Sequence, residues 1–380
     1  MDFQFTEEQI MFRDMVRDFA RKEITPIAAE IDQQARFPHE IIEKMKELGL
    51  LGMTAPEEFG GAAVDELSHI LAIEELGRVC SSTAITVAVH HSVVQEPIAH
   101  FGTHEQKSKY LRALATGASL GAFALTEPDA GSDAAGIRTV AVRDGDDYII
   151  NGTKNFITNG GVAGIILVAA YTDKSKGHKG ISFFIVERDT PGFKVGKKED
   201  KMGVRGSDTS QLIFEDCRIT PDNRLGQEGE GFKIMMQTLD GSRIGVAAQA
   251  VGLARGALDA AVHYSQERMQ FNKPLAQFQA IQFMLADMAT EIDAAALLAY
   301  RAAVLKDQGR KISKESAMAK LYASEMVQRV TYKAIQIHGA YGYIKEYDVE
   351  RFYRDARATT IYEGTSEIQR LVVARNILRD

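Results

Sequence analysis

Residues 120–228 of this 380-residue chain lack the helical periodicity that runs through the segments on both sides of them. Asp144-Gly145 is a strong hairpin signal between two β-rich runs, and Gly, Asp and Pro separate the other runs. The short β-rich runs are 122–125, 139–143, 148–151, 165–171, 181–186 and 211–214. Because no helical segment lies between them, they predict a compact all-β module and not a βαβ sheet.

The flanking segments repeat apolar residues at helical spacing. Thr6, followed by two glutamates, marks the start of a first amphipathic helix that ends near Thr25-Pro26. Further helices are expected at 38–48, 65–78, 83–100, 104–115, 232–269, 278–308, 313–338 and after Thr365. Long helices joined by short loops predict a bundle. We therefore expect an N-terminal helical domain (1–119), a middle β domain (120–228) and a C-terminal helical bundle domain (229–380).

Charge and cysteine usage narrow the choice of partner and compartment. The formal net charge of −7 argues against a nucleic-acid or anionic-membrane partner. Cys80 and Cys217 match no metal-ligand spacing and no disulfide framework, which favours a reducing compartment. The N-terminus lacks the basic and apolar regions of a signal peptide, and the apolar run 244–262 is interrupted by charged residues. We expect a cytoplasmic protein with no metal site and no membrane span.

The segment Ile-Tyr-Glu-Gly-Thr-Ser-Glu-Ile-Gln-Arg (361–370) places a carboxylate, Glu363, beside a glycine at the start of the last helix. Ser366 with Gln369 three residues later matches a capping box, so Ser366 is the expected N-cap. Two interpretations are open for Glu363. It can be an acid that stabilises the helix N-terminus, or a carboxylate that faces a cleft beside free backbone N–H groups. On these residues alone the first interpretation is favoured.

Two stretches of the β module could bind a flat, polar ligand. Residues 126–133 (Thr-Glu-Pro-Asp-Ala-Gly-Ser-Asp) combine hydroxyls, a turn and backbone N–H groups beside Gly131, which suit a phosphate or ring edge as well as a plain surface loop. Further on, Phe156 and Thr158 are two residues apart and are expected on one face of a strand. Sheet cores carry such pairs too, so both interpretations stay open.

Other motifs are interpreted as structural. The order Gly226-x-x-Gly229-x-Gly231 differs from GxGxxG and no βαβ unit surrounds it, so it is expected to be a flexible joint between domains. His90, His91 and His338 lack Cys or carboxylate partners at ligand spacing.

Five stretches together resemble the motifs of the acyl-CoA dehydrogenase family, in the family's order and across all three regions. They are 123–133, 154–159 (Lys-x-Phe-Ile-Thr-Asn), 198–205 (Lys-Glu-Asp-Lys-Met-Gly-Val-Arg), 267–275 (Glu-Arg-Met-Gln-Phe-Asn-Lys-Pro-Leu) and 361–370. The resemblance is closest to the short-chain, butyryl-CoA branch. It implies an α+β multidomain fold with a central β-barrel-like domain and a C-terminal four-helix bundle. It also implies a homotetramer, a dimer of dimers, that uses FAD to oxidise acyl-CoA thioesters to trans-2-enoyl-CoA.

The resemblance assigns cofactor contacts residue by residue. Thr126 is expected near the polar edge of the flavin, Phe156 on the ring, where many relatives have Trp, and Thr158 near N5. Arg268 resembles an arginine that binds the FAD pyrophosphate of a neighbouring subunit, and Phe278 replaces a residue that is often His. The expected FAD contacts are Phe123, Leu125, Thr126, Gly131, Ser132, Phe156, Ile157, Thr158, Arg268, Phe271, Phe278, Gln279, Gln336, Gly339, Ala340, Thr365 and Glu367.

The segment Asp240-Gly241-Ser242-Arg243 resembles the part of the family that holds CoA. The isovaleryl and long-chain branches carry their catalytic glutamate at the position of Ser242. Serine cannot remove a proton from carbon, so the resemblance assigns the general base to Glu363, with hydride transfer to flavin N5. The expected substrate contacts are Ser132, Asp240, Arg243, Tyr362, Gly364 and Arg375. Family members pass their electrons to an electron-transferring flavoprotein, so such a partner is expected.

Three alternatives remain at this point. A short branched-chain acyl-CoA dehydrogenase would need only a wider pocket. An acyl-CoA oxidase would share the fold, although oxidases usually carry an extra C-terminal helical domain and this chain ends at Asp380. A non-catalytic helical assembly protein is disfavoured by the presence of Glu363, Thr158 and Arg268.

Overall fold

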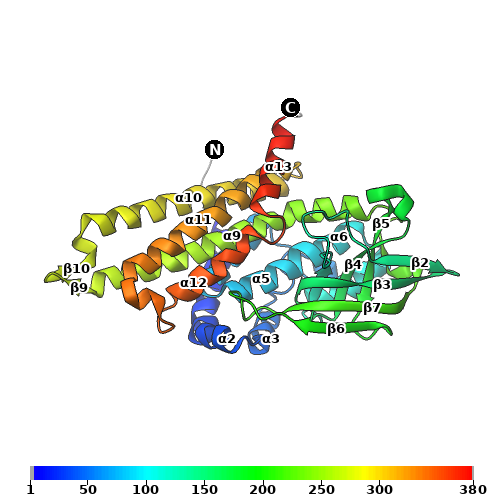
Figure 1. Ribbon diagram of the computed structural model, residues 1–380, viewed down its shortest axis with the longest axis horizontal. Coiled ribbons are helices and arrows are strands. Elements are labelled where there is room, and N and C mark those ends of the chain that lie inside the picture. Colours follow the sequence, from blue (N-terminus) through cyan, green and yellow to red (C-terminus); the bar gives the residue numbers. More distant parts are fainter. Residues whose placement is uncertain (1–3, 379–380) are drawn as a thin grey trace.

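The computed structural model describes residues 4–378 and arranges them as helices, then a β module, then helices (Figure 1). The first helix begins where the sequence predicts, because the Thr6 hydroxyl accepts the Gln9 N–H in a capping box. The N-terminal helices are α1 (Glu7–Phe19), α2 (Ala28–Gln34), α3 (His39–Glu47), α4 (Glu66–Val79), α5 (Ser81–Val89), α6 (Glu96–Phe101), α7 (His104–Gln106) and α8 (Arg112–Ala115), with short π- and 3-10-helical segments between several of them.

The β module is one mixed sheet with the strand order β6-β7-β3-β2-β4-β5-β8, in which β1 pairs with β4. Its strands are β1 (Gly121–Ala124), β2 (Val140–Asp144), β3 (Asp147–Thr158), β4 (Ile165–Tyr171), β5 (Ile181–Glu187), β6 (Phe193–Lys198), β7 (Thr209–Ile219) and β8 (Arg224–Leu225). The hairpin at Asp144-Gly145 is confirmed: Asp144 faces Asp147, and Gly145 has a φ of 63°. One apolar cluster takes side chains from β1 to β5 and β7, so the sheet curls around a shared core, as a barrel-like domain requires.

The C-terminal helices are α9 (Gly231–Glu267), α10 (Gln279–Asp307), α11 (Ser313–His338), α12 (Val349–Ala356) and α13 (Ser366–Ile377), with a small hairpin of β9 (Met269–Gln270) and β10 (Lys273–Pro274). Helices α9, α10 and α11 run side by side, and α13 projects from the bundle (Figure 1). The bounds of the three long helices match the prediction within two residues, whereas α12 was not predicted.

The N-terminal and C-terminal helices bury one common core. A single apolar cluster combines side chains from α1, α4 and α9 to α12. Helix α9 lies directly against α4 because two of its residues lack a side chain: a Cβ on Gly252 would lie 2.0 Å from the Glu74 carbonyl oxygen, and one on Gly256 would lie 2.2 Å from that of Arg78.

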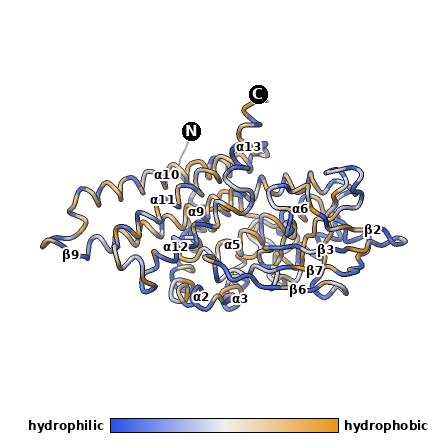
Figure 2. Tube along the Cα trace, viewed as in Figure 1, coloured by the Kyte–Doolittle hydropathy of each residue, from blue (hydrophilic) through white to orange (hydrophobic). Residues whose placement is uncertain are grey.

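Figure 2 shows hydrophilic residues recurring along each of the long helices. Within residues 4–378, no helix is both long and apolar enough to span a bilayer.

Candidate active site

The turn before α13 has an unusual backbone. Glu363 has a φ of 52° and Gly364 a φ of 97°, so two consecutive residues adopt left-handed conformations. Because the chain becomes extended only after them, the N-cap is Thr365, whose hydroxyl accepts the Ile368 N–H. The prediction of Ser366 as N-cap was therefore wrong. Ser366 is already the first, buried residue of the helix.

Side chains from distant elements hold this turn. The Tyr362 hydroxyl donates to Gln249 Oε1 on α9 at 2.6 Å, and Gln249 Nε2 donates to Ser81 Oγ at 2.7 Å. Lys320 Nζ on α11 donates to the Gly364 carbonyl oxygen at 2.7 Å. The Gln369 amide, expected to complete a capping box, donates instead to the carbonyl oxygens of the two left-handed residues. These contacts hold the carbonyl groups of Glu363 and Gly364 in place.

The Glu363 carboxyl is the candidate catalytic group of this turn. The residue is half-buried, and its Oε2 is buried with no hydrogen-bond partner within residues 4–378. Burial raises the pKa of the carboxyl above its usual range, while the nearby Ser242 hydroxyl and the charges of Lys320 and Arg243 pull the pKa back. The backbone N–H groups of Glu363 and Gly364 also have no acceptor in the described chain. A carboxyl with a raised pKa thus lies beside free N–H donors.

The structure brings most of the expected substrate residues to this carboxyl. Ser242 contacts Glu363, and Arg243 is buried and donates to Asp240 at 2.7 Å. Tyr362 and Gly364 flank the carboxylate in the chain. The two outliers are Ser132, exposed in the loop after β1, and Arg375, exposed near the end of the projecting α13.

The β module presents an aromatic ring beside hydroxyl groups. Phe156 is 61% exposed and has a φ of 58°, at a bulge in β3 that shifts the register between Lys154 and Ile157. The bulge leaves Phe156 and Thr158 on the open side and turns the Ile157 side chain into the sheet core, so only the main chain of Ile157 could touch a ligand. The hydroxyls of Thr126 and Thr158 have no protein partner within residues 4–378.

A buried ion pair fixes the loop that carries Thr126. Lys154, fully buried, donates from Nζ to Glu127 Oε1 at 2.7 Å and to the Leu125 carbonyl at 3.0 Å. The Asn155 N–H donates to the Thr126 carbonyl at 2.8 Å. Phe123, Leu125 and Tyr362 pack against one apolar cluster, which joins this loop to the Glu363 turn. Exposed Gly131 and Ser132 lie further along the loop.

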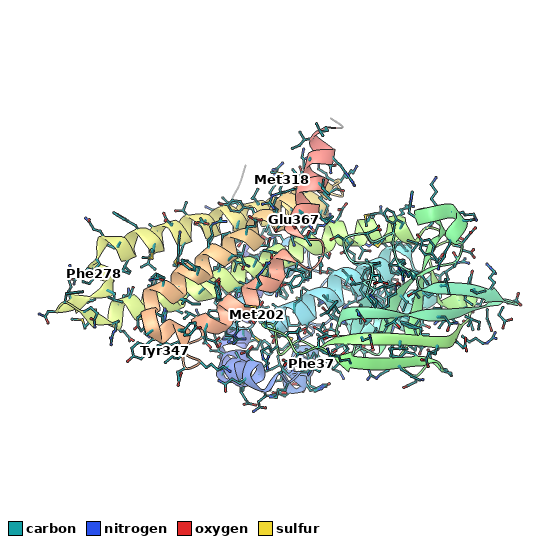
Figure 3. The ribbon with its side chains drawn as sticks, in the orientation of Figure 1. Phe37, Met202, Phe278, Met318, Tyr347 and Glu367 are labelled. Carbon is teal, nitrogen blue, oxygen red and sulfur yellow. The ribbon has the colours of Figure 1, made fainter. Side chains whose placement is uncertain are left out.

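Most of the remaining expected cofactor residues lie at the end of the helical bundle that carries the β9–β10 hairpin. Arg268 lies over the Tyr341 ring, with 5.4 Å from Cζ to the ring centroid, and Phe271 is 87% exposed at the tip of the β9–β10 hairpin. Figure 3 shows Phe278 at this far end of the bundle and Glu367 at the base of α13. From Ser242 to Arg268, α9 rises by about 39 Å. Also exposed at the far end are Gln279, Gln336, Gly339 and Ala340.

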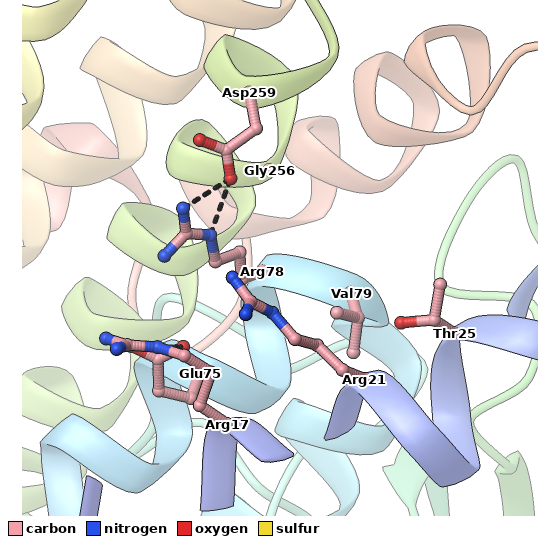
Figure 4. Close-up of a pocket in the computed structure, with 8 residues that line it drawn as sticks. All are labelled: Arg17, Arg21, Thr25, Glu75, Arg78, Val79, Gly256 and Asp259. Atoms are coloured by element: carbon pink, nitrogen blue, oxygen red, sulfur yellow. Dashed lines mark hydrogen bonds and ion pairs between the residues drawn. The ribbon is translucent and has the colours of Figure 1, made fainter. Parts of the chain in front are cut away.

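A cavity of about 230 Å³ between α1, α4 and α9 lies apart from these residues (Figure 4). Its arginines are largely neutralised: Arg17 pairs with Glu75 at 2.7 Å, and Arg78 Nε donates to Asp259 at 2.6 Å. No residue predicted to bind cofactor or substrate lines it.

The buried histidines have structural partners. His90 Nδ1 accepts the Gly121 N–H at 3.1 Å, and its Nε2 lies 3.1 Å from the Leu51 carbonyl oxygen. Burial lowers the pKa of His90 to about 4, so the ring is neutral. His91 and His338 likewise bond to main-chain groups.

Sequence reasoning missed Lys320 and Gln249 as parts of the site. Both left a signal. Gln249 interrupts an apolar helical run, and Lys320 lies on the small-residue face of α11, where its neighbours at helical spacing are Ser316, Ala317, Ala323 and Ser324. A polar residue in such a position requires a buried partner.

The structure thus places a β module between two sets of helices, with the Glu363 turn joined to the loop after β1 by one apolar cluster. Three family models match successive parts of the chain. The acyl-CoA dehydrogenase N-terminal domain matches residues 6–118, the middle domain 122–217 and the C-terminal domain 229–378. The chain belongs to the acyl-CoA dehydrogenase family. Members of this family are FAD-dependent oxidoreductases that act on a CH–CH bond.

Two curated relatives match the chain along its full length. The short-chain specific acyl-CoA dehydrogenase of Clostridium acetobutylicum is 50% identical, covering 100% of both chains. The acryloyl-CoA reductase (NADH) of Anaerotignum propionicum is 51% identical, covering 100% of this chain and 96% of the relative.

Solved structures agree with these matches. Butyryl-CoA dehydrogenase from Megasphaera elsdenii is 49% identical, with a TM-score of 0.98 over 100% of both chains. A chain from a study of the electron transferring flavoprotein of Acidaminococcus fermentans is 53% identical, with a TM-score of 0.99 over 100% of both chains. The prolyl acyl carrier protein oxidase AnaB is 36% identical, with a TM-score of 0.95 over 98% of this chain and 100% of its own.

Proposed function

We propose that this chain oxidises short-chain acyl-CoA thioesters, with butyryl-CoA as the preferred type, to trans-2-enoyl-CoA, and that Glu363 is the general base. The observation that carries the proposal is the Glu363 carboxyl, with its buried, unpaired Oε2 and a serine in place of a second acid at position 242. A base for a carbon acid needs a raised pKa and a lone pair that no protein donor occupies.

The residues of the β module fit a flat heterocycle with polar edges. Phe156 offers an exposed ring for stacking, and the unpartnered hydroxyls of Thr126 and Thr158 can bond to such edges. When bound, FAD supplies the hydride acceptor. These observations support FAD contacts by Phe123, Leu125, Thr126, Gly131, Ser132, Phe156 and Thr158, and a main-chain contact by Ile157. On the helical side, Thr365 and Glu367 complete the expected contacts.

The chain's own groups perform the proton transfer. The free N–H of Glu363 can donate to the thioester carbonyl oxygen and stabilise the charge that develops there as the α-proton leaves. The carboxylate of the same residue then accepts that proton. Asp240 and Arg243 lie one helical turn or less from Ser242 and are positioned to hold the CoA part, with Tyr362 and Gly364 shaping the turn. Arg375 and Ser132 would contact outer parts of CoA.

Acyl-chain preference is tested by bleaching of the flavin. The purified protein, loaded with FAD and kept anaerobic, is mixed with butyryl-, hexanoyl-, octanoyl-, isobutyryl- and 2-methylbutyryl-CoA. We expect the fastest bleaching with butyryl-CoA. Fastest bleaching with a branched thioester would assign the chain to the branched-chain alternative, and no bleaching by any of them would contradict the proposal.

We also propose a homotetramer, a dimer of dimers, in which each FAD contacts two subunits. The support is the group of exposed residues at the far end of the bundle, about 39 Å along α9 from Ser242. Arg268, Phe271, Phe278, Gln279, Gln336, Gly339 and Ala340 would contact a neighbour's FAD. Native mass spectrometry tests the assembly. Arg268→Met should lower FAD content while the subunit fold, measured by circular dichroism, stays unchanged.

The expected electron acceptor is an electron-transferring flavoprotein in the cytoplasm. The free, buried cysteines Cys80 and Cys217 suit a reducing compartment. An oxidase remains the rival. Chain length does not separate the two, since AnaB is an oxidase that the chain covers completely. Release of hydrogen peroxide during turnover would favour the oxidase.

We also propose the domain boundaries 1–119, 120–228 and 229–380. The β module has an apolar core of its own, whereas the N-terminal and C-terminal helices share one.

A second candidate function is reduction of the enoyl thioester. A relative named acryloyl-CoA reductase is as similar to this chain as the dehydrogenases are. The same groups can run both directions, because protonated Glu363 can return the α-proton. Comparing butyryl-CoA oxidation with acryloyl- and crotonyl-CoA reduction, using one electron carrier at fixed pH, decides the preferred direction.

A further inference from the structure

Lys320 is a buried cation directly behind the Glu363 turn. It lies on α11, has no exposed surface, and is surrounded along the helix by small buried residues. Ser316, Ala317, Ala323 and Ser324 leave room for its four-carbon chain to reach the turn. A fully buried lysine is rare, because removing an ammonium from water carries a large energetic cost. The position therefore requires an explanation.

Its contact with the turn is direct. Lys320 Nζ donates to the Gly364 carbonyl oxygen at 2.7 Å, and Gln369 Nε2 donates to the same oxygen at 2.9 Å and to the Glu363 carbonyl oxygen at 3.1 Å. Holding these carbonyls inward keeps both residues in left-handed conformations. The N–H groups of Glu363 and Gly364 have no acceptor in the described chain and are available to a ligand.

Within the described residues, Lys320 has no carboxylate that forms an ion pair with its ammonium. Arg243 is the other buried cation, and it is already paired with Asp240 at 2.7 Å. No carboxylate within residues 4–378 lies within 4.0 Å of the Lys320 ammonium, so none forms an ion pair with it. Its long-range attraction is first to Glu363, then to Glu367 on α13 and Glu325 on its own helix.

We propose that Lys320 is a positioning residue for the proposed dehydrogenation: its ammonium fixes the Gly364–Thr365 peptide of the Glu363 turn and supplies the positive charge that keeps Glu363 ionised when substrate excludes water. The inference rests on the proposed function of Glu363 as the base. Lys320 touches no reacting atom and acts through the turn.

The protonation states agree with this role. Burial lowers the pKa of Lys320 to about 8, with the three glutamates raising it and Arg243 lowering it further. Lys320 is therefore mostly charged at neutral pH. On the other side, Glu363 is faced by Ser242, Lys320 and Arg243, all of which oppose the rise in its pKa that burial causes. Removing the Lys320 charge must raise the pKa of Glu363.

The test separates the charge of Lys320 from its hydrogen bond. Lys320→Gln keeps a donor for the Gly364 carbonyl without the charge, and Lys320→Arg keeps the charge. Gln369→Met is the matched control, because it removes neutral donors from the same carbonyls. The rate of anaerobic flavin bleaching by butyryl-CoA is measured in a single turnover between pH 5.5 and 9. Infrared spectroscopy follows the protonated Glu363 carboxyl band, assigned by its loss in Glu363→Gln, over the same range without substrate.

We expect Lys320→Gln to move the acid limb of the rate profile, and the midpoint of the infrared band, upward by about one pH unit. Lys320→Arg should restore both positions, and Gln369→Met should slow bleaching without moving either. An unmoved limb and midpoint in Lys320→Gln would overturn the inference and leave Lys320 as a structural residue. If wild-type protein binds FAD but is not bleached, the proposed function fails, and the infrared midpoint still decides whether Lys320 controls the ionisation of Glu363.

Discussion

The buried pair of Lys154 and Glu127 allows a quantitative test of how the cofactor loop is held. Lys154→Met removes the cation while Glu127, whose side chain is 5% exposed, stays buried. Removing one partner of a buried pair costs about 3–5 kcal/mol. Glu127 keeps hydrogen bonds from the Thr139 N–H at 3.0 Å and the Thr139 hydroxyl at 2.6 Å, so we expect the lower end, about 3 kcal/mol.

The stability lost in Lys154→Met should depend on pH in one direction. In the wild type, Lys154 and the hydrogen bonds hold the pKa of Glu127 below its usual value although burial opposes them. The stability that Glu127 contributes is present above its unfolded pKa and is lost as the pH falls through the folded one. Without Lys154, burial dominates and the pKa rises, so Glu127 accepts a proton at higher pH. The difference between wild type and variant should therefore narrow as the pH falls from 7 toward about 4.5.

Hydrogen exchange in increasing urea measures the effect locally, on the paired amides of β3 and β7. The chain contains no tryptophan, which rules out the usual fluorescence probe. The double variant Lys154→Met/Glu127→Gln replaces the stranded charge by a neutral acceptor and should recover at least about 1 kcal/mol. A loss below about 1 kcal/mol in Lys154→Met, or a double variant no more stable than the single one, would refute this account of the loop.

Three further predictions concern the site. Tyr362→Phe leaves Gln249 Oε1 buried without its donor, so urea unfolding should show a free energy of unfolding lower by about 1–3 kcal/mol, with FAD still bound. An unchanged stability would contradict a stabilising role of the Tyr362–Gln249 hydrogen bond. Phe156→Ala should lower FAD affinity by about tenfold while stability changes by less than about 0.5 kcal/mol, because the ring is mostly exposed; flavin titration and thermal melts measure the two effects. Ser242→Glu in a Glu363→Gly background should restore part of the bleaching rate, since the two side chains are in contact, and an inactive double variant would argue against a shared position.

Periodicity alone predicted the long helices well. The expected helices at 278–308 and 313–338 differ from α10 and α11 by one residue or none at each end. Long amphipathic segments average over many residues, so single exceptions do not hide the pattern. Helix α12 spans only eight residues, and four of the eight are charged, so no comparable pattern marked it.

The site depended on contacts that join distant parts of the chain. Lys320 reaches a carbonyl 44 residues away, and Lys154 reaches a carboxylate 27 residues away. A sequence pattern can place a lysine on a buried face but cannot identify the acceptor that makes burial tolerable. The left-handed conformations of Phe156 and Glu363 were equally inaccessible, because residues other than glycine rarely adopt them and nothing local requires them here. Glu363 itself was singled out only through the family resemblance.

The most direct test of the central claim is the single-turnover rate of flavin bleaching by butyryl-CoA in Glu363→Gln. Glutamine keeps the size of the side chain and the backbone N–H but cannot accept the α-proton. Bound FAD and the affinity for butyryl-CoA should match the wild type. The matched control is Glu40→Gln, which removes a surface carboxylate on α3 that pairs with Arg36. We predict a bleaching rate lower by about 10²–10⁴ in Glu363→Gln and an unchanged rate in the control. A Glu363→Gln rate within a factor of ten of the wild type would contradict Glu363 as the base.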